Sequence, residues 1–213
     1  MKIVVIHGQS HKGSTYHIAR LVADKLGGDV TEFFLPRDFG DICVGCANCI
    51  MKNEQLCPHY KKLLPLTQAM DEADILILAS PVYVCHATGA MKAFLDHYGY
   101  RFMVHRPQAS MFTKQAVCIS TAAGSGTKKT NQDMADSLFY WGTGKIYKYG
   151  VNVASINWEG VSEKKKNAIE KHTSSLARKL AKKTGKGQTG TKNQSLLLFI
   201  PLSTEKRLEP SGC

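Results

Sequence analysis

Apolar residues occur in two patterns along the chain, as short consecutive runs and at helical spacing. Segments of the two kinds alternate. Five short segments, most of them rich in consecutive apolar and β-branched residues, are typical of strands buried on both faces. They cover residues 2–7, 29–35, 75–80, 115–120 and 147–156. Other segments have apolar positions at helical spacing and predict helices; they cover residues 18–26, 65–72, 89–98, 134–141 and 163–184. Strands that alternate with crossover helices predict an α/β fold with one parallel sheet covered on both faces.

The expected topology is flavodoxin-like: a doubly wound, five-stranded parallel sheet in the order 2-1-3-4-5 with helices on both faces. In such a sheet a ligand binds at the carboxyl ends of the strands, near the point where the strand order reverses. The loops that leave the first, third and fourth strands, residues 8–15, 80–88 and 121–129, hold much of the chain's Ser, Thr, Gly and Pro. We therefore expect these three loops to converge on one crevice.

One domain accounts for most of the chain. With 213 residues, of which 43% are hydrophobic, the chain can bury a full core. We expect a flavodoxin-like, ligand-binding domain over residues 1–184, which includes a cysteine-rich insertion at 38–59, and a basic linker and tail over 185–213. The apolar run 195–202 is expected to pack on its own domain, with a dimer contact as the alternative.

The net charge of +11 is concentrated in the last quarter of the chain, where residues 161–213 carry twelve Lys or Arg against four Asp or Glu. A solvated helix face with a loose tail explains this excess, and a phosphorylated or acidic partner is the alternative. Nucleic acid is not expected as a partner, because the sequence offers no recognisable reading helix. No apolar run approaches the roughly 18 residues of a membrane span, and the chain opens on a strand rather than a leader, so we expect a cytoplasmic protein.

The loop after the first strand has the composition of an anion site. It reads Gly8-Gln9-Ser10-His11-Lys12-Gly13-Ser14-Thr15 and leads into the first predicted helix. The first turn of a helix has unpaired N–H groups and the positive end of the macrodipole, while Ser10, Ser14 and Thr15 can donate hydroxyl hydrogen bonds. The loop lacks the Walker A and dinucleotide glycine spacings. A phosphomonoester, such as that of flavin mononucleotide (FMN), is therefore the expected ligand.

The second loop carries a longer signature. Ser80-Pro81-Val82-Tyr83 and Thr88-Gly89-Ala90-Met91-Lys92-Ala93-Phe94-Leu95-Asp96 resemble the Ser-Pro-Val-Tyr and Thr-Gly-x-Met-Lys-x-Phe-x-Asp signature of the NAD(P)H-dependent FMN reductase family. Together with the first loop and with residues 120–127 of the third, the resemblance runs from residue 1 to about residue 158. The first loop departs from the family at Gln9-Ser10-His11, where Ser-Pro-Arg is common.

This resemblance implies that the protein binds FMN, uses NAD(P)H as co-substrate and forms a homo-oligomer, either a dimer or a tetramer. It implies a phosphate held by four residues of the first loop: Ser10, Lys12, Ser14 and Thr15. It places the flavin ring against Pro81, Val82 and Tyr83. Residues of the third loop approach the ring from the other side: Thr121, Ala122, Ala123, Gly124 and Gly126. No catalytic side chain is expected, because the flavin carries the redox chemistry.

Four of the seven cysteines form a compact set, Cys43-x2-Cys46-x2-Cys49-x7-Cys57. Four soft thiolates so closely spaced predict an iron-sulfur cluster or zinc, and a set of free or disulfide-forming redox thiols stays open as the alternative. The spacing resembles the motif of the iron-sulfur flavoproteins, which implies a [4Fe-4S] cluster near FMN. Cys118, on the fourth strand, is expected to be a small buried residue.

Two functions of different class follow from these features. The leading hypothesis is an oxidoreductase that passes electrons from NAD(P)H through FMN to a quinone, flavin, metal or protein acceptor. The alternative is a non-enzymatic iron-sulfur flavoprotein that takes electrons from a ferredoxin-like partner. Charge discriminates between them, since carriers that dock on basic reductases are usually acidic and this chain is basic. Tyr98 and Trp141 are expected in the core rather than at the flavin.

Overall fold

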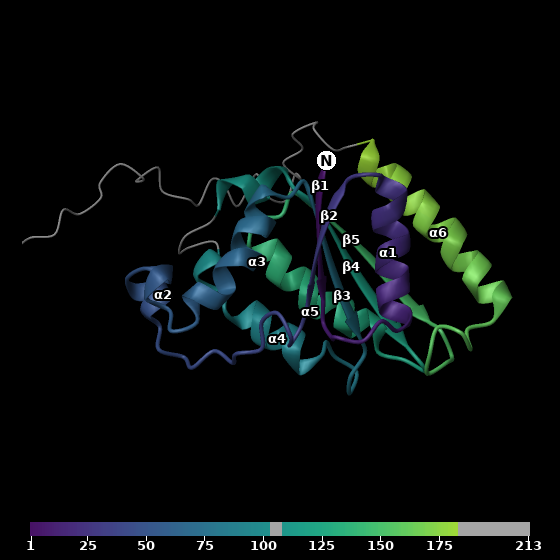
Figure 1. Ribbon diagram of the computed structural model, residues 1–213, viewed down its shortest axis with the longest axis horizontal. Coiled ribbons are helices and arrows are strands. Elements are labelled where there is room, and N and C mark those ends of the chain that lie inside the picture. The colour runs from purple at the N-terminus through teal and green to yellow at the C-terminus, as the bar shows by residue number, and fades with distance from the viewer. Residues whose placement is uncertain (103–107, 183–213) are drawn as a thin grey trace, which may run out of the picture.

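The computed structural model describes residues 1–102 and 108–182. Its centre is a sheet of parallel strands in the order β2-β1-β3-β4-β5, which confirms the predicted fold and strand order (Figure 1). The strands are β1 (Lys2–His7), β2 (Asp29–Phe34), β3 (Ile75–Pro81), β4 (Gln115–Ala122) and β5 (Lys145–Asn152). Because the strands are parallel, their carboxyl ends lie along one edge of the sheet, and that edge is where such folds bind ligands.

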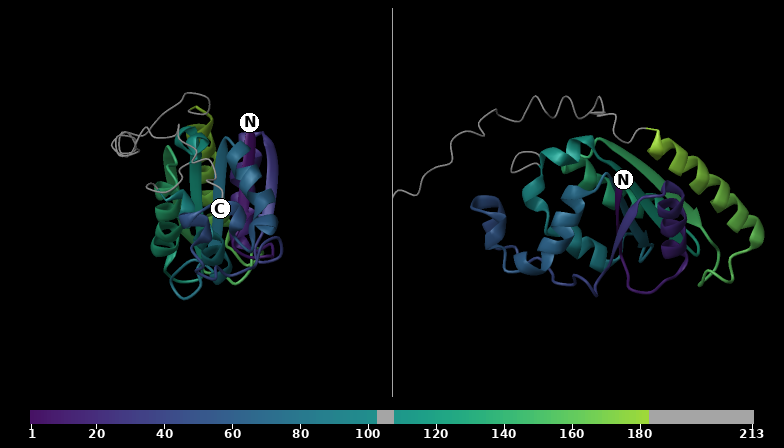
Figure 2. Two further views of the ribbon diagram at one scale, coloured as in Figure 1. Left: turned by 90° about the vertical axis from the view of Figure 1, so that its left-hand side faces the viewer. Right: turned by 45° about the horizontal axis from the view of Figure 1, so that its top comes forward.

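Helices cover both faces of the sheet, as Figures 1 and 2 show. The described helices are α1 (Ser14–Leu26), α2 (Asn48–Met51), α3 (Tyr60–Glu72), α4 (Gly89–Asp96), α5 (Thr127–Tyr140) and α6 (Glu163–Ala181). Helices α1 and α6 lie on one face, and α3, α4 and α5 on the other. Helix α2 belongs to the cysteine-rich insertion and lies away from the sheet, at the far left of Figure 1.

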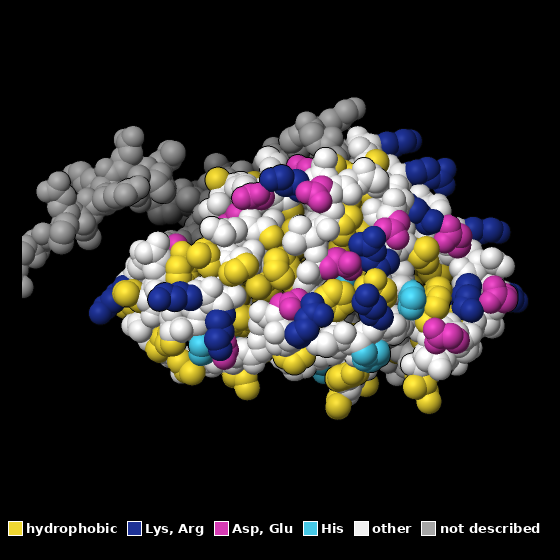
Figure 3. All heavy atoms as spheres, in the orientation of Figure 1, with side chains coloured by type: hydrophobic (Ala, Val, Ile, Leu, Met, Phe, Trp, Pro, Cys, Tyr) yellow, Lys and Arg dark blue, Asp and Glu magenta, His cyan; other side chains and the backbone are white. Residues whose placement is uncertain are grey.

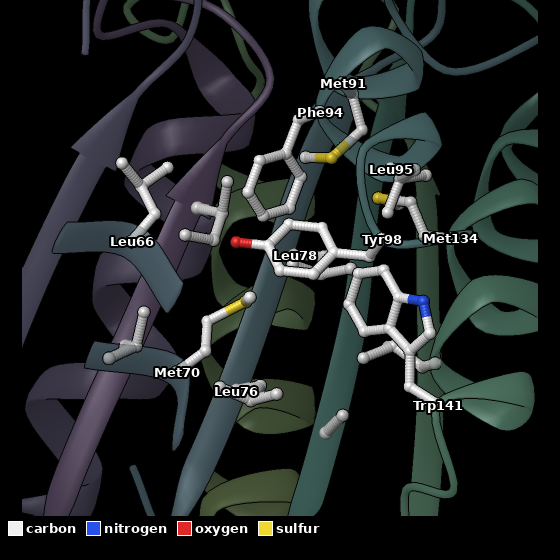
Figure 4. Close-up of a cluster of buried hydrophobic side chains, with 14 of the residues drawn as sticks. Leu66, Met70, Leu76, Leu78, Met91, Phe94, Leu95, Tyr98, Met134 and Trp141 are labelled. Carbon is white, nitrogen blue, oxygen red and sulfur yellow. The ribbon is translucent and has the colours of Figure 1, made fainter. Parts of the chain in front are cut away.

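The core under α3, α4 and α5 contains the aromatic residues that the sequence assigns to it (Figure 4). Tyr98 is fully buried, and its ring centroid lies 5.0 Å from that of Trp141. The Tyr98 hydroxyl is 2.9 Å from Thr67 Oγ1, and burial raises the pKa of the phenol. Cys118 is also fully buried, and burial raises the pKa of its thiol. The predicted core roles of Tyr98, Trp141 and Cys118 are therefore confirmed.

The second core lies between the sheet and the α1–α6 pair. Ile18 and Val22 of α1 are buried with Leu176 and Leu180 of α6 in one cluster against the sheet. The outer side of α6 is polar, and its exposed cations include Lys164, Lys171, Arg178 and Lys179. Figure 3 shows Lys and Arg side chains along its right-hand edge, where α6 lies in Figure 1. Part of the basic charge therefore sits on a solvated helix face.

One predicted helix start is wrong. The sequence places Pro65 at the opening of a helix, because proline fits the first helical position. The structure begins α3 at Tyr60 and keeps Pro65 inside it. Proline in a helix interior removes one hydrogen bond, but Leu63, Leu66 and Met70 are each buried on this helix, and their packing holds it together through the proline.

The fifth strand and its neighbouring helices also begin or end elsewhere than predicted. Strand β5 ends at Asn152, not at residue 156, because the Asn152 side chain accepts a hydrogen bond from the Ala154 N–H and turns the chain out of the sheet. Ala154 has a φ of 50°, which no strand residue adopts. Helix α5 begins at Thr127 and so takes in the end of the predicted 121–129 loop, and α6 ends at Ala181.

The predicted tail, 185–213, lies outside the described residues, together with its apolar run 195–202 and Cys213. Within the described ranges, no helix is both long and apolar enough to cross a lipid bilayer.

Candidate functional site

A cavity of about 340 Å³ lies at the carboxyl edge of the sheet. It is bounded by the loops that leave β1, β3 and β4, which run along the lower side of Figure 1, and by the segment that follows β5. Its lining residues are Gln9, His11, Ser14, Thr15, Pro81, Val82, Tyr83, Thr121, Ala122, Ala123, Val153, Ser155 and Ile156. The predicted convergence of three loops on one crevice is therefore confirmed, and a fourth segment joins them.

The first and second loops are joined at Gly8. The Thr88 hydroxyl donates a hydrogen bond to the Gly8 carbonyl over 2.6 Å, and the Thr88 N–H donates to the Ser80 hydroxyl over 3.0 Å. A side chain at position 8 would place its Cβ 3.0 Å from both of those hydroxyl oxygens. Thr88 also caps α4, since its oxygen accepts the Met91 N–H over 3.1 Å. These hydrogen bonds hold the first and second loops together beside the cavity.

The start of α1 forms one end of the cavity. Ser14 and Thr15 are the first residues of the helix, both are buried, and the first turn contains no acidic residue. Thr15 Oγ1 lies 2.6 Å from Thr121 Oγ1, which ties this end to the β4 loop. The Ser14 hydroxyl is buried and has no hydrogen-bond partner among the described residues. A buried polar group without a partner at a helix N-terminus is suited to receive an anion.

The second loop forms a tight turn beside the cavity. Val82 donates its N–H to the Thr121 carbonyl over 2.9 Å, and Tyr83 and His86 pair through both backbone groups. Val84 and Cys85, at the tip, have φ values of 49° and 66°, which are uncommon for residues other than glycine. The Tyr83 hydroxyl donates to Gln9 Oε1 over 2.9 Å, so the ring is fixed across the cavity from the first loop.

The third loop packs against this turn at Gly126. Gly126 has a φ of 104°, and a Cβ there would lie 2.6 Å from Val82 Cγ1. Glycine is therefore required both by the backbone conformation and by the close approach of the two loops. Ala122 and Ala123 of the same loop line the cavity, whereas Gly124 and Gly126 do not.

Eight of the twelve cofactor residues predicted from the sequence line this cavity: Ser14, Thr15, Pro81, Val82, Tyr83, Thr121, Ala122 and Ala123. Ser10 instead donates its hydroxyl to the Leu35 carbonyl over 3.2 Å, beside β2. Lys12 is exposed, with Nζ 5.2 Å from the centroid of the Tyr16 ring. Neither residue lines the cavity, and nor do Gly124 and Gly126.

The segment that follows β5 also lines the cavity, through Val153, Ser155 and Ile156, and was not predicted to do so. The signal was present, because this segment leaves the same edge of the sheet as the other three loops. Extending the fifth strand to residue 156 concealed it. Ile156 is 99% exposed, so this segment adds an exposed apolar side chain to the cavity lining.

The four clustered cysteines meet at a second place, in the insertion before α3. Cys43, Cys46, Cys49 and Cys57 all line one cavity of about 20 Å³. Burial, and then the neighbouring Cys57, raise the pKa of the Cys49 thiol. The four cysteines therefore lie around one small pocket, and their role as ligands stays a prediction. His59 and His97 line the same cavity, although His97 lies far along the chain, at the end of α4.

Comparison with known proteins places the chain in a family. The sequence model of the NADPH-dependent FMN reductase family matches residues 1–157, which is most of the chain and includes all four segments of the large cavity. The protein belongs to this family. The match confirms the resemblance drawn from the loop motifs.

Solved structures agree with this assignment of the FMN reductase fold. An NADH:FMN oxidoreductase in its apo form is 20% identical to this chain and has a TM-score of 0.60. The matched region covers 92% of this chain and 98% of that protein's chain. An NAD(P)H:quinone oxidoreductase from Methanothermobacter marburgensis is 13% identical to this chain and has a TM-score of 0.61. The matched region covers 84% of this chain and 95% of that protein's chain. At these identities the likeness shows the fold.

Sequence relatives include proteins named iron-sulfur flavoprotein. One from Archaeoglobus fulgidus is 40% identical over 81 residues, which are 37% of this chain and 36% of the relative. This chain spans only 36% to 51% of the length of the iron-sulfur flavoproteins that it matches.

The large cavity fits the FMN that the family implies. The buried, partnerless Ser14 hydroxyl and the first-turn N–H groups of α1 suit a phosphate, and no carboxylate is among the described lining residues. Pro81, Val82 and Ala122 supply flat, apolar and backbone-lined walls for a ring system. The four-cysteine pocket fits a cluster in its donor set, since iron-sulfur clusters are held by cysteine thiolates. Its space of about 20 Å³ would have to widen to receive one.

Proposed function

We propose that this protein is an FMN-dependent oxidoreductase that passes electrons from NAD(P)H to a quinone, flavin, metal or protein acceptor. The observation that carries the proposal is the Ser14 hydroxyl, which is buried without a partner at the N-terminus of α1 and lines the cavity. When bound there, FMN supplies the redox chemistry, taking two electrons from the nicotinamide and delivering them to the acceptor. Membership of the FMN reductase family supports this assignment.

The residues of the cavity bind and orient the cofactor. Ser14 and Thr15 donate hydroxyl hydrogen bonds to the phosphate, and the N-terminus of α1 offers unpaired N–H groups and a favourable dipole. Pro81, Val82 and Tyr83 hold one side of the flavin ring, with Tyr83 fixed through Gln9. Thr121, Ala122 and Ala123 hold the other side. No side-chain acid or base is required, so the protein contributes position, polarity and access.

The mouth of the cavity is the place where the second substrate would enter. Among the lining residues, Tyr83 is 52% exposed and Ile156 is almost fully exposed. Apolar side chains in such a position suit the flat faces of a nicotinamide and of a quinone or flavin acceptor.

The exposed Ile42, Val44 and Met51 of the cysteine-rich insertion add apolar surface that a second copy of the chain would cover, which supports a homo-oligomer.

Anaerobic reduction tests the oxidoreductase. Protein loaded with FMN should lose its oxidised-flavin absorbance when NADH or NADPH is added without oxygen, and a quinone added afterwards should restore it. The ratio of the two reduction rates identifies the preferred nicotinamide. Persistence of the oxidised spectrum with both nucleotides would contradict the proposed reaction, whereas failure to load FMN would contradict the proposed site.

A second candidate function is that of an iron-sulfur flavoprotein electron carrier with a ferredoxin-like partner. The observation that favours it is the convergence of Cys43, Cys46, Cys49 and Cys57 on one pocket, together with relatives that bear this name. Iron and sulfide analysis after anaerobic reconstitution tests it. An iron-sulfur carrier should contain four irons and four sulfides per chain. The Cys43→Ser variant should lose the iron and sulfide and retain FMN. Iron at background in the native protein would exclude the carrier.

A further inference from the structure

Two histidines that are distant in the sequence meet against the cysteine pocket. His59 immediately precedes α3 and His97 immediately follows α4, and His59 Nδ1 lies 2.8 Å from His97 Nε2. One nitrogen of each ring and the Cys57 sulfur all lie within 4.8 Å of one another. The four-cysteine motif does not explain this arrangement, because its ligands are complete without the two rings.

The hydrogen bonds of His97 determine which nitrogen faces the pocket. Its Nδ1 is 2.7 Å from the Ala93 carbonyl oxygen, and a carbonyl can only accept, so Nδ1 carries a hydrogen. Nε2 of the neutral ring therefore presents its lone pair, and His59 Nδ1 donates to it. A ring N–H bound to a backbone carbonyl is the arrangement that orients metal-binding histidines, because it fixes the tautomer of the other nitrogen.

Packing holds the His97 ring in this orientation. The side chain is only 4% exposed, and the Phe39 ring meets it edge-on with centroids 4.8 Å apart. A ligand that cannot rotate loses little conformational entropy when it binds an ion. The pocket is thus preorganised on its histidine side.

We propose that Cys57, His59 and His97 form a mononuclear site for a divalent transition metal ion of the zinc class. On binding, the Cys57 thiol releases its proton to solvent, and the hydrogen on His59 moves from Nδ1 to Nε2. The ion then takes the thiolate and the two freed nitrogen lone pairs, and water fills the fourth tetrahedral position. Typical bond lengths of ~2.0–2.3 Å require only small movements of the three side chains.

The ligand set and the enclosed space both favour a single ion. One thiolate and two imidazoles are characteristic zinc ligands, whereas iron-sulfur clusters use thiolates almost exclusively. The cavity of about 20 Å³ has room for one water-sized particle. Because Cys57 belongs to both ligand sets, an ion at this site and a cluster on the four cysteines exclude each other. The proposed site joins the insertion to the end of α4, and it does not depend on the flavin site.

Cobalt titration of the full-length protein tests the site. Chelator-treated, reduced protein should bind one Co²⁺ per chain, with thiolate-to-cobalt charge-transfer bands and tetrahedral d–d bands, and Zn²⁺ should displace it. His97→Gln, His59→Ala and Cys57→Ser should each weaken Co²⁺ binding by at least about tenfold, because each removes a ligand. Cys43→Ser is the matched control, since it removes a pocket thiol outside the triad and should leave the affinity unchanged.

Several results would overturn the proposal. Equal weakening by Cys43→Ser and by His97→Gln would place the ion on the four cysteines, and undiminished affinity in His59→Ala or His97→Gln would remove the histidines from the site. FMN affinity, measured on each variant at the separate large cavity, reports whether the fold is intact. His59 is only partly buried, so His59→Ala decides the question if the change at the buried His97 disrupts folding.

Discussion

Two hydroxyl groups at the start of α1 are the residues on which the flavin proposal most depends. Hydrogen bonds to charged groups contribute roughly 1.5–3 kcal/mol each, so replacing both Ser14 and Thr15 by Ala should weaken FMN binding at least tenfold. Fluorescence titration of flavin-free protein measures this. Ser10→Ala is the matched control, because the Ser10 hydroxyl bonds to the Leu35 carbonyl and should leave FMN affinity unchanged. Equal effects of the two changes would mean that the phosphate lies elsewhere.

His7, the last residue of β1, makes stability depend on pH. The residue is buried, and burial lowers its pKa below the usual value of about 6.5 even though Nε2 lies 2.8 Å from Glu32 Oε1. The unfolded chain therefore binds a proton at higher pH than the folded chain does. Stability should be full above about pH 7 and should fall as the pH drops through the unfolded value toward the lower folded one.

Urea unfolding at pH 8 and pH 5.5 checks this expectation. His7→Gln, which keeps a hydrogen-bonding group but does not titrate, should lose less stability between the two pH values than the native protein. Some loss should remain, since burial also lowers the pKa of His17 and of His172. Identical losses in the two proteins would mean that His7 does not contribute.

Residues of the site differ in how far the sequence reveals them. Ser14 and Thr15 could be predicted, because a strand, a hydroxyl-rich loop and a helix in that order define a helix N-terminus and its donors. Ser10 belongs to the same motif, yet it bonds to Leu35 after β2, and no local pattern specifies that partner. The meeting of His59 with His97 depends on how α3 and α4 pack, which is a tertiary property.

At the scale of the structural elements, the loops that follow β3 and β4 meet at Gly126. Gly126→Ala would introduce a Cβ 2.6 Å from Val82 Cγ1 at a φ of 104°. We expect a stability loss of ~1–3 kcal/mol and weaker FMN binding, because the β3 turn would be displaced. Thermal unfolding and FMN titration measure the two effects.

Gly124→Ala is the control for this change, since a Cβ at Gly124 meets no atom within 4 Å. It should unfold like the native protein and bind FMN with native affinity. If Gly126→Ala behaves in the same way, the close packing of the two loops is not required for the site.

Element boundaries were predicted less well than element types, for physical reasons. Strand β5 ends early because the Asn152 side chain captures the Ala154 N–H, a competition that apolar periodicity does not register. Helix α3 continues through Pro65 because buried Leu63, Leu66 and Met70 outweigh one lost hydrogen bond. In both cases a contact beyond the local pattern decides where the element stops or starts.

At the scale of the whole molecule, the strand order was predicted from the alternation of strands and helices together with the right-handed crossover rule. That order brings together loops separated by more than a hundred residues, as the 2.6 Å contact between Thr15 and Thr121 illustrates. The site is therefore a consequence of the topology, while its chemistry comes from the loop residues. The cysteine-rich insertion is held apart from this edge, at the far end of the molecule from α6 in Figure 1.

The identity of the bound flavin tests the central claim most directly. The first loop is proposed to receive a terminal phosphate, and it lacks the glycine spacing of dinucleotide sites, so the full-length protein should hold FMN rather than FAD. Mass spectrometry of the cofactor released from purified or reconstituted protein, with its stoichiometry per chain, measures this. The account predicts one FMN per chain. FAD at full occupancy, or a protein that takes up no FMN on reconstitution, would contradict it.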